Sequence, residues 1–396
     1  MISNKMMEYV SNSSIIRAMF EEGKRLSSIY GEENVFDFSL GNPNVQPPDN
    51  IKKAILEILS EESPTLVHGY MNNSGYEDIR AEIASHLSRK YNLKLTSNNL
   101  IMTCGAAGGL NILLKTLLNP GDEVITFAPF FGEYKNYANN FEGNLVVVSS
   151  NLETFEPNLE ELKEKITNKT KAIIINSPNN PTGVVYSETF IKELADLLNK
   201  KQEKLNTSIY LISDEPYREI VYDGVKVPYI LKYYRNSFIG YSYSKSLSLP
   251  GERIGYIACN GEMDDFENVM QSLNVANRIL GFVNAPSLFQ RVIGKCLDTE
   301  VDVNIYKRNR DLLYNHLTEI GFPCVKPQGA FYLFPKSLIA DDKKFAVEAK
   351  KFNILLVPGS AFGCPGHFRL SYCISYEKIE KSLDSFDKLA KIYLGS

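Results

Sequence analysis

Short apolar runs alternate with stretches of helical periodicity over most of this chain, and this alternation constrains the fold more than any other feature. One face of a predicted helix carries Tyr76, Ile79, Ile83, Leu87 and Tyr91. The apolar run LIMTC follows this helix and is typical of a strand. Later strand-like runs, separated by helical stretches, are EVITFA (123–128), NLVVVS (144–149), KAIIIN (171–176), SIYLIS (208–213), SFIGYS (237–242) and RIGYIAC (253–259). This order predicts an α/β fold in which helices flank a mostly parallel central sheet.

The proportions of helix and strand change beyond residue 290. A long helical region around 284–319 precedes the short runs AFYLFP, NILLVP and FRLSYC, and a helix closes the chain. The prolines of GNPNVQPP resist helix formation, so this segment is expected to link an N-terminal arm to the sheet. We predict a large domain over residues 49–285 and a smaller α+β domain, formed by residues 286–396 together with the arm and linker over 1–48.

Charge balance and the length of the apolar runs limit the partners of this chain. Its 43 basic and 47 acidic side chains give a formal net charge of −4, which provides no extended cationic surface for nucleic acid or anionic lipid. No apolar run reaches the roughly 18 residues that a membrane span needs, and the N-terminus lacks the apolar segment of a secretion signal. We therefore expect a cytoplasmic protein that acts on small molecules and binds neither nucleic acid nor a membrane.

Cysteine and histidine usage predicts reduced thiols and no metal site. The six cysteines form no CxxC pair and no dense disulfide framework, and they stand at positions 104, 259, 296, 324, 364 and 373. The four histidines offer no HExxH motif and no Cys/His cluster with metal-ligand spacing. The chemistry of the chain is therefore expected to come from other residues.

The segment SYSKSLSLPGERIGY, residues 242–256, follows a predicted strand and carries the densest group of candidate site residues. Ser242 and Ser244 can donate to phosphate oxygens, and Arg253 can clamp a phosphate through two parallel hydrogen bonds. Lys245 between them can attack an aldehyde once it is deprotonated. A lone lysine in such a segment would instead indicate a polar surface loop, so this interpretation depends on the neighbouring residues.

Two further polar motifs follow predicted strands, at the sheet edge where open α/β folds bind ligands. In SDEPYREI, Asp214 can keep a pyridine nitrogen protonated, and the alternative is an ordinary turn aspartate. In NSPNNPTG, Asn180 can donate to a phenolate oxygen, and Pro181 and Gly183 fix the loop that holds it. Asn-Pro turns are common, so NSPNNPTG indicates a binding site only in combination with SDEPYREI.

A small-residue turn and an aromatic segment also follow strand-like runs. In TCGAAGGL, the residues Gly105, Ala106 and Ala107 open a predicted helix, whose free backbone N–H groups attract phosphate. Close packing of a helix on a strand demands the same small residues, and this is the alternative. In PFFGEY, Phe131 can stack on a planar cofactor, although most such rings belong to a core.

In chain order, these motifs form the series glycine turn, aromatic, NPTG, Asp-x-x-Tyr, SxSK and GxRxGY. The series resembles the class I/II aminotransferases, which are pyridoxal 5′-phosphate enzymes of fold type I in the aspartate aminotransferase superfamily. The resemblance extends from GNP at 41 through PQGAFYLFP at 327–335 to FRLSY at 368–372, and so covers essentially the whole chain. It implies an aminotransferase that moves an amino group between an L-amino acid and a 2-oxo acid by a ping-pong mechanism.

The resemblance also implies roles for individual residues. Lys245 would hold pyridoxal 5′-phosphate as a Schiff base and move a proton at the substrate Cα. Asp214 would pair with the pyridine nitrogen, and Asn180 and Tyr217 would approach the ring O3′. The other implied cofactor contacts are ring stacking by Phe131 and phosphate binding by Gly105, Ala106, Ala107, Ser242, Ser244 and Arg253.

Substrate binding and assembly follow from the same resemblance. Arg369 would grip the substrate α-carboxylate with its planar fork, with Asn180 beside it and Gly41 in close backbone contact. The alternative for Arg369 is a surface ion pair. Tyr70, in HGYMNNSGY, matches a tyrosine that reaches the phosphate in the neighbouring subunit, which implies a homodimer with shared active sites.

The chain departs from the family pattern at a few positions. Ala106 and Ala107 stand where many relatives carry a hydroxyl, which removes a possible side-chain contact to phosphate. Phe131 stands where many carry tryptophan or tyrosine, so the stacking ring has no polar group. Neither change removes a catalytic group.

Two other functions and the choice of substrate stay open. A carbon–sulfur β-lyase on the same fold would use the same cofactor to expel a thiol. A non-catalytic module would bind cofactor or amino acid without turnover. Arg278, in NVANRILGF, could bind the distal carboxylate of an acidic substrate, or it could be a solvated surface charge.

Overall fold

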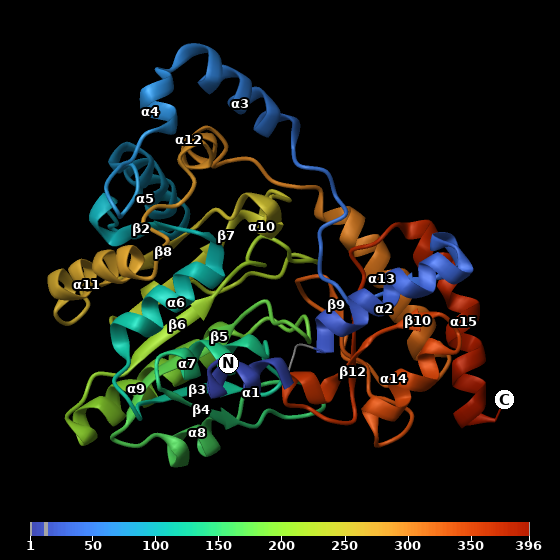
Figure 1. The fold of residues 1–396 in the computed structure, drawn as a ribbon. Helices are drawn as coiled ribbons and strands as arrows, with labels where there is room; N and C mark the ends of the chain where they lie inside the picture. The colour runs from blue at the N-terminus through green and yellow to red at the C-terminus, as the bar shows by residue number, and fades with distance from the viewer. Residues whose placement is uncertain (1, 12–14, 396) are drawn as a thin grey trace.

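A mixed sheet lies at the centre of the larger part of the molecule. In the computed structural model, which describes residues 2–11 and 15–395, this sheet has seven strands in the order β2-β8-β7-β6-β5-β3-β4 (Figure 1). The strands are β2 (Leu100–Thr103), β3 (Glu123–Phe127), β4 (Asn144–Val148), β5 (Thr170–Asn176), β6 (Tyr210–Asp214), β7 (Ser237–Ser242) and β8 (Gly255–Cys259). Neighbouring strands from β4 to β7 pair in parallel, whereas β8 runs antiparallel to β7 and β2. The predicted α/β fold with a mostly parallel sheet is confirmed.

The central strands are buried on both faces because alternate residues enter two different apolar cores. Along β5, Ile173 and Ile175 lie in one core. Ala172 and Ile174 lie in the other. A parallel strand covered on both faces needs apolar residues at consecutive positions, which explains why KAIIIN is a continuous apolar run.

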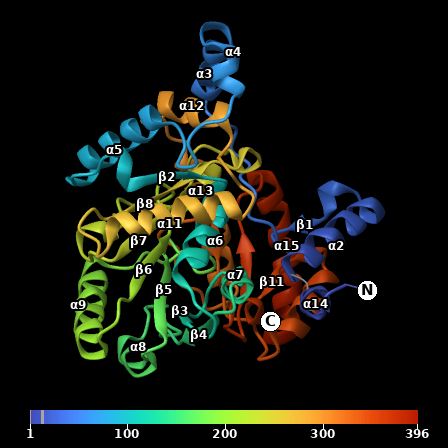
Figure 2. The ribbon, with the colours of Figure 1, turned by 60° about the vertical axis from the view of Figure 1, so that its left-hand side comes forward.

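Helices cover both faces of this sheet. The helices that pack on one core are α6 (Gly105–Leu117), α7 (Glu133–Asn140) and α11 (Phe266–Ile279), seen in front of the strands in Figure 2. Those that pack on the other are α3 (Asp49–Glu61), α5 (Glu77–Tyr91), α8 (Leu159–Lys165), α9 (Glu188–Leu205) and α12 (Ser287–Lys295). The short helices α4 (Pro64–His68) and α10 (Tyr243–Ser246) follow α3 and β7. None of the helices in the described ranges is long and apolar enough to cross a membrane.

The carboxyl-terminal part has its own apolar core and a small antiparallel sheet. Its strands and helices are β9 (Tyr332–Leu333), β11 (Val357–Pro358), β12 (Phe368–Ser371), α13 (Val303–Glu319), α14 (Asp342–Lys350) and α15 (Tyr376–Leu394). Across the whole described chain, short 3₁₀ turns lie at Glu32–Asn34, Ser97–Asn99, Ile230–Lys232, Pro250–Glu252 and Gly359–Phe362.

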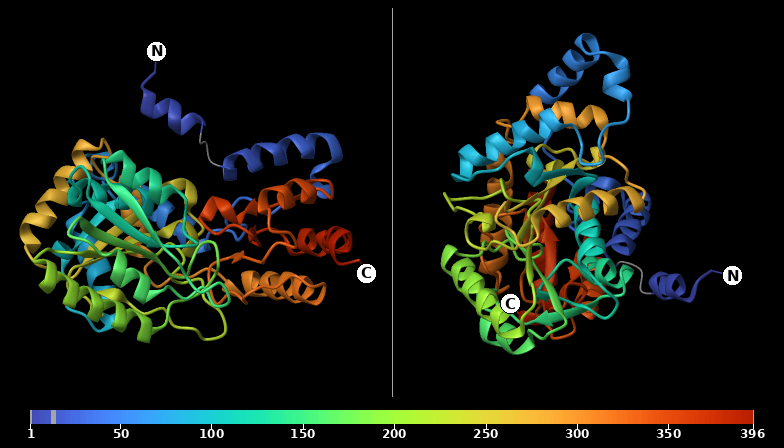
Figure 3. Two further views of the ribbon diagram at one scale, coloured as in Figure 1. Left: turned by 90° about the horizontal axis from the view of Figure 1, so that it is seen from below. Right: turned by 90° about the vertical axis from the view of Figure 1, so that its left-hand side faces the viewer.

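The N-terminal arm joins this smaller unit. Strand β1 (Phe36–Asp37) pairs in parallel with β10 (Ile354–Leu355). Ahead of β1, α2 (Ile15–Tyr30) packs on the small unit through Leu26, which meets Leu355. Helix α1 (Asn4–Ser11) turns away from that unit (Figure 3) and lies against α7, where Lys5 donates to the backbone oxygen of Asn139 at 2.6 Å. The pairing of β1 with β10 thus brings an early and a late segment of the chain together in the small unit. The assignment of all of residues 1–48 to that unit stays a prediction. Residues 1 and 12–14 of the predicted arm lie outside the described residues.

The predicted helical region around 284–319 differs in one respect from the structure, which divides it into α12 and α13. The side chain of Asp302 accepts a hydrogen bond from the backbone N–H of Asn304 and so starts a new helix. Val292 and Ile293 of α12 are buried in a core of the large sheet. The predicted domain boundary at residue 286 therefore stays a prediction, and it falls just before a helix that packs on the larger unit.

Replacing Leu198 by alanine tests the core under α9. This side chain is fully buried, so Leu198→Ala should lower the free energy of unfolding of the apoprotein by about 2–5 kcal/mol in urea titrations. Leu152 is 60% exposed, and Leu152→Ala should change the same free energy by less than about 0.5 kcal/mol. Equal effects of the two variants would contradict the packing described for α9.

Candidate active site

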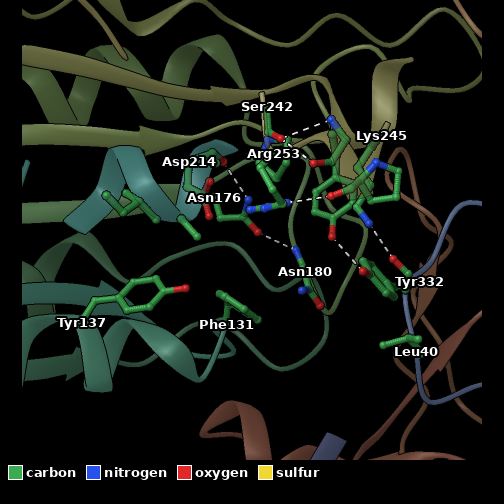
Figure 4. A pocket seen from close by; sticks show the side chains of 18 of the residues that line it. Leu40, Phe131, Tyr137, Asn176, Asn180, Asp214, Ser242, Lys245, Arg253 and Tyr332 are labelled. Carbon is green, nitrogen blue, oxygen red and sulfur yellow. Dashed lines mark hydrogen bonds between the residues drawn. The ribbon is translucent and has the colours of Figure 1, made fainter. Parts of the chain in front are cut away.

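A cavity opens where several strands of the large sheet end, facing the smaller unit (Figure 4). Asn176, Asp214 and Ser242 are the last residues of β5, β6 and β7, and all three line it. Its volume is about 290 Å³. Parallel strands place their carboxyl ends at one edge of the sheet, which is where open α/β sheets bind ligands.

The cavity brings together most of the residues that the sequence indicated. The predicted site residues that line it are Gly41, Ala106, Ala107, Phe131, Asn180, Asp214, Tyr217, Ser242, Ser244, Lys245, Arg253 and Arg369. Gly105 lies directly behind this wall, because a Cβ on it would stand 2.8 Å from an Nη atom of Arg253. Tyr70 is 95% exposed and lies outside the cavity.

Asp214 presents one bound and one unbound carboxylate oxygen. Its Oδ2 accepts a hydrogen bond of 2.6 Å from the hydroxyl of Tyr134 on α7, whereas its buried Oδ1 has no partner in the described part of the chain. Burial raises the pKa of Asp214 to about 7, and the Tyr134 hydrogen bond opposes this shift. A cationic N–H group placed at Oδ1 would satisfy the free oxygen and favour the charged carboxylate.

Lys245 carries an amine that is poorly solvated. Its Nζ donates a hydrogen bond of 2.6 Å to the carbonyl oxygen of Gly41 and lies 5.4 Å from the centre of the Phe331 ring. Burial lowers the pKa of this amine to about 8, and the positive charges of Arg253 and Arg369 act in the same direction. At pH 7 roughly a tenth of Lys245 is therefore unprotonated and nucleophilic, far more than for an ordinary lysine.

Arg369 is a buried cation on β12 that faces the large unit. Its Nη1 donates a 3.0 Å hydrogen bond to Oδ1 of Asn180, and its Nη2 donates to the carbonyl oxygen of Ser39. Its guanidinium lies 4.6 Å from the centre of the Tyr332 ring. The Nε atom is buried without a partner among the described residues, so the guanidinium keeps donor capacity for an anion in the cavity.

A pair of phenols lies beside these two cations. The hydroxyls of Tyr217 and Tyr332 are 2.7 Å apart. A Cβ on Gly41 would come 2.1 Å from the Tyr332 hydroxyl, so only glycine fits at position 41 without displacing that tyrosine. Burial raises the pKa of Tyr332 to about 12, which keeps this phenol protonated and able to donate.

The opposite side of the cavity gathers hydrogen-bond donors at the start of α6. Ser242 and Ser244 have hydroxyls 2.7 Å apart, and Ser242 also accepts from the backbone N–H of Ser244. Arg253 donates to the carbonyl oxygen of Pro250 at 2.9 Å, with an exposed guanidinium near Gly105. A helix N-terminus, hydroxyls and an arginine together form a site that suits an anion such as phosphate.

Several lining residues were not indicated by the sequence analysis. Asn176 donates through Nδ2 to the backbone oxygen of Asp214 and accepts from the backbone N–H of Asn180, each at 2.7 Å. The other residues that sequence reasoning missed are Leu40, Leu110, Tyr137, Pro216, Pro250 and Tyr332 in the wall, and Tyr134 behind Asp214. A polar residue that ends an otherwise apolar strand, as in KAIIIN, was the available signal for Asn176. Tyr134 lies in the same PFFGEY segment as Phe131.

Arg278 takes no part in the cavity of its own chain. It is exposed near the end of α11 and is not among the lining residues. Within the described ranges, no cluster of three His, Cys, Asp or Glu side chains could hold a metal ion.

Comparison with known proteins places these features in a family. The model for "Aminotransferase class I and II" matches residues 33–386. A probable aspartate/prephenate aminotransferase of Aquifex aeolicus is 33% identical, with 90% of this chain and 91% of that protein covered. A probable aspartate aminotransferase of Methanocaldococcus jannaschii is 35% identical over 88% of this chain and 91% of its own length.

Solved structures agree with this result. A crystal structure of an aminotransferase from Eubacterium rectale has a TM-score of 0.96 and 46% identity, covering 99% of both chains. The aspartate aminotransferase of Thermotoga maritima has a TM-score of 0.86 and 29% identity, covering all of both chains. The fold is that of a transferase enzyme. The chain belongs to the class I and II aminotransferase family.

The ionisation of Lys245 can be measured directly. Competitive acetylation of the apoprotein, followed by peptide mass spectrometry, should give half-maximal reactivity of Lys245 at about pH 8, because burial disfavours the ammonium form. Exposed lysines in the same digest serve as internal standards. A midpoint near the ordinary value of 10.5 would contradict the desolvated environment described for this amine.

Proposed function

We propose that this aminotransferase binds pyridoxal 5′-phosphate in the cavity at the strand ends and uses it to move an amino group between an L-amino acid and a 2-oxo acid. The observation that carries the proposal is the meeting of a desolvated Lys245 amine and the unpaired Oδ1 of Asp214 in one cavity. The Lys245 amine can form a Schiff base with an aldehyde, and Oδ1 of Asp214 can accept a hydrogen bond from a cationic N–H group. Pyridoxal 5′-phosphate carries both.

The remaining polar groups of the cavity fit the same cofactor. Ser242, Ser244, Arg253 and the N–H groups of residues 105–107 would hold its phosphate. The side-chain oxygen of Asn180 accepts a hydrogen bond from Arg369, which leaves its amide nitrogen to donate to the ring O3′. The phenol of Tyr217 would donate to the same oxygen. Phe131 would cover one face of the ring.

The bound cofactor supplies an aldehyde that takes up the amino group and a protonated ring that accepts an electron pair from the substrate Cα. Lys245 is the base that removes the proton from this Cα and later delivers it, since its depressed pKa leaves the amine free to accept a proton near neutral pH. Asp214, as a carboxylate, holds a proton on the ring nitrogen. The first oxo acid leaves before the second enters, which gives ping-pong kinetics.

Arg369 orients the substrate. Its planar fork would bind the two oxygens of the substrate α-carboxylate, and Asn180 and the Tyr332 ring fix the position of that fork. Gly41 allows the backbone to pass close to the Tyr332 hydroxyl, where a Cβ would come within 2.1 Å, and its carbonyl oxygen holds the Nζ of Lys245. The buried surroundings exclude water from the reacting carbon and strengthen these charge contacts.

We also propose a homodimer in which Tyr70 of one subunit contacts the phosphate bound by the other. Tyr70 is 95% exposed and follows α4, and the neighbouring Leu56, Leu59 and Leu66 expose apolar side chains as well. Helices α3 and α4 project from the rest of the chain (Figure 1). Exposed apolar side chains on a projecting element are typical of an interface between subunits. The cytoplasmic location expected from the sequence stays a prediction.

Replacing Lys245 by alanine tests the catalytic assignment. Lys245→Ala should reduce transamination by about 10³-fold or more, because the variant has no base at the substrate Cα, while cofactor binding persists through the phosphate contacts. Lys200 is exposed on α9, and Lys200→Ala serves as the matched control with wild-type rates. Near-normal turnover by Lys245→Ala would overturn the assignment. Release of pyruvate and thiol from cysteine-like substrates, without transamination, would indicate a β-lyase.

Hybrid dimers test whether the active site is shared. Tyr70→Ala should weaken cofactor binding by about tenfold or more, since it removes a hydrogen bond to a charged phosphate. Refolding a mixture of Tyr70→Ala and Lys245→Ala chains should then restore one complete site per hybrid dimer, measured as turnover at limiting cofactor. If Tyr70 served its own subunit, hybrids would contain no complete site and the mixture would stay as weak as its components.

A further inference from the structure

The strongest unassigned feature of the site is a buried hydrogen bond behind Asp214. From it we propose that Tyr134 is a positioning residue, which locks one oxygen of the Asp214 carboxylate and so sets the ionisation with which Asp214 meets the cofactor ring. The proposal rests on the proposed binding of pyridoxal 5′-phosphate in this cavity. Tyr134 does not line the cavity, and it acts only through Asp214.

When Asp214 is ionised, Tyr134 is the donor of this hydrogen bond. Tyr134 is 1% exposed, and its hydroxyl lies 2.6 Å from Oδ2 of Asp214. A carboxylate only accepts, so the phenol donates. The hydrogen bond to Oδ2 restrains rotation of the carboxylate, and Asn176 holds the backbone oxygen of the same residue. Its unpaired Oδ1 is therefore fixed in the wall of the cavity.

The segment that carries Tyr134 also carries the proposed stacking ring. The backbone N–H of Tyr134 donates to the carbonyl oxygen of Phe131 at 3.1 Å. The two rings meet edge to face, with centroids 5.7 Å apart. One turn at the start of α7 thus supports both the face of a bound ring, through Phe131, and its nitrogen edge, through Asp214.

The charges around Asp214 explain why this donor matters. The pKa of Asp214 is raised to about 7, with burial as the largest cause and the negative charge of the neighbouring Glu215 acting in the same direction. Two phenols face the same carboxyl group, the half-buried Tyr137 from α7 and the buried Tyr217 after β6. The Tyr134 hydrogen bond is the influence that lowers the pKa of Asp214. Without it, a larger share of Asp214 is protonated near neutral pH and cannot pair as an anion with the ring nitrogen.

The proposal predicts a shift in a binding profile that does not depend on turnover. The measurement is the dissociation constant of the full-length protein for pyridoxal 5′-phosphate and for its 1-deaza analogue, in which carbon replaces the ring nitrogen, between about pH 5 and pH 9. Ionisation of Lys245 affects both ligands alike. The ratio of the two constants therefore reports Asp214 opposite the ring nitrogen.

In the wild-type protein the preference for the natural cofactor should appear as pH rises through the pKa of Asp214. In Tyr134→Phe this midpoint should move to higher pH by about one unit or more, the effect expected for losing a hydrogen bond to a charged group. A 3-fluorotyrosine at position 134, whose more acidic phenol donates more strongly, should move it to lower pH. This second change preserves the hydrogen bond and the packing, so it tests the proposal even if the phenylalanine variant folds poorly.

Tyr234 supplies the matched control. It is also 1% exposed, and its hydroxyl donates a 2.7 Å hydrogen bond to the backbone oxygen of Ile209, away from the cavity. Tyr234→Phe should lower the thermal stability of the protein and leave the midpoint unchanged. An unchanged midpoint in Tyr134→Phe, or an equal shift in Tyr234→Phe, would overturn the role of Tyr134. A wild-type protein that binds both ligands equally at every pH would instead overturn the proposed pairing of Asp214 with the ring.

Discussion

The guanidinium of Arg369 joins three parts of the chain that are remote in sequence. It projects from β12, donates to Asn180 in the loop after β5, and donates to Ser39 in the N-terminal arm. A buried cation is stable only where hydrogen-bond acceptors surround it, and here these acceptors come from both structural units. The contact that holds the smaller unit over the sheet edge is therefore also the contact that positions the proposed carboxylate-binding group.

The cavity concentrates charge that the protein itself does not fully neutralise. Lys245, Arg369 and Asp214 are all withdrawn from water, and Asp214 retains an unpaired oxygen. Such an arrangement costs folding free energy, and sites of this kind are typical of places where a ligand completes the set of charges. The pKa of Lys245 falls and that of Asp214 rises, so burial favours the neutral form of both groups until a ligand restores their partners.

Sequence reasoning located the fold and most of the cavity wall because both depend on local pattern. Strand runs such as KAIIIN and SFIGYS correspond closely to β5 and β7, since a strand buried on both faces must be apolar along its whole length. The residues it missed act through contacts between distant segments. Tyr134 meets Asp214 only once α7 has packed on the large sheet, and Tyr332 meets Tyr217 only once the small unit has joined it. The division between α12 and α13 did have a local signal, the capping residue Asp302.

The parallel pairing of β1 with β10 has a consequence for the order in which the molecule can be built. A ribosome releases the arm first and β10 among the last segments, so the arm has no strand partner during most of synthesis. The paired strands of the large sheet are closer together in the sequence than β1 and β10, so this sheet can form before β1 pairs with β10. Gly41 and Ser39 then reach Lys245 and Arg369 at the end, and a nascent chain carries a formed sheet without a finished pocket.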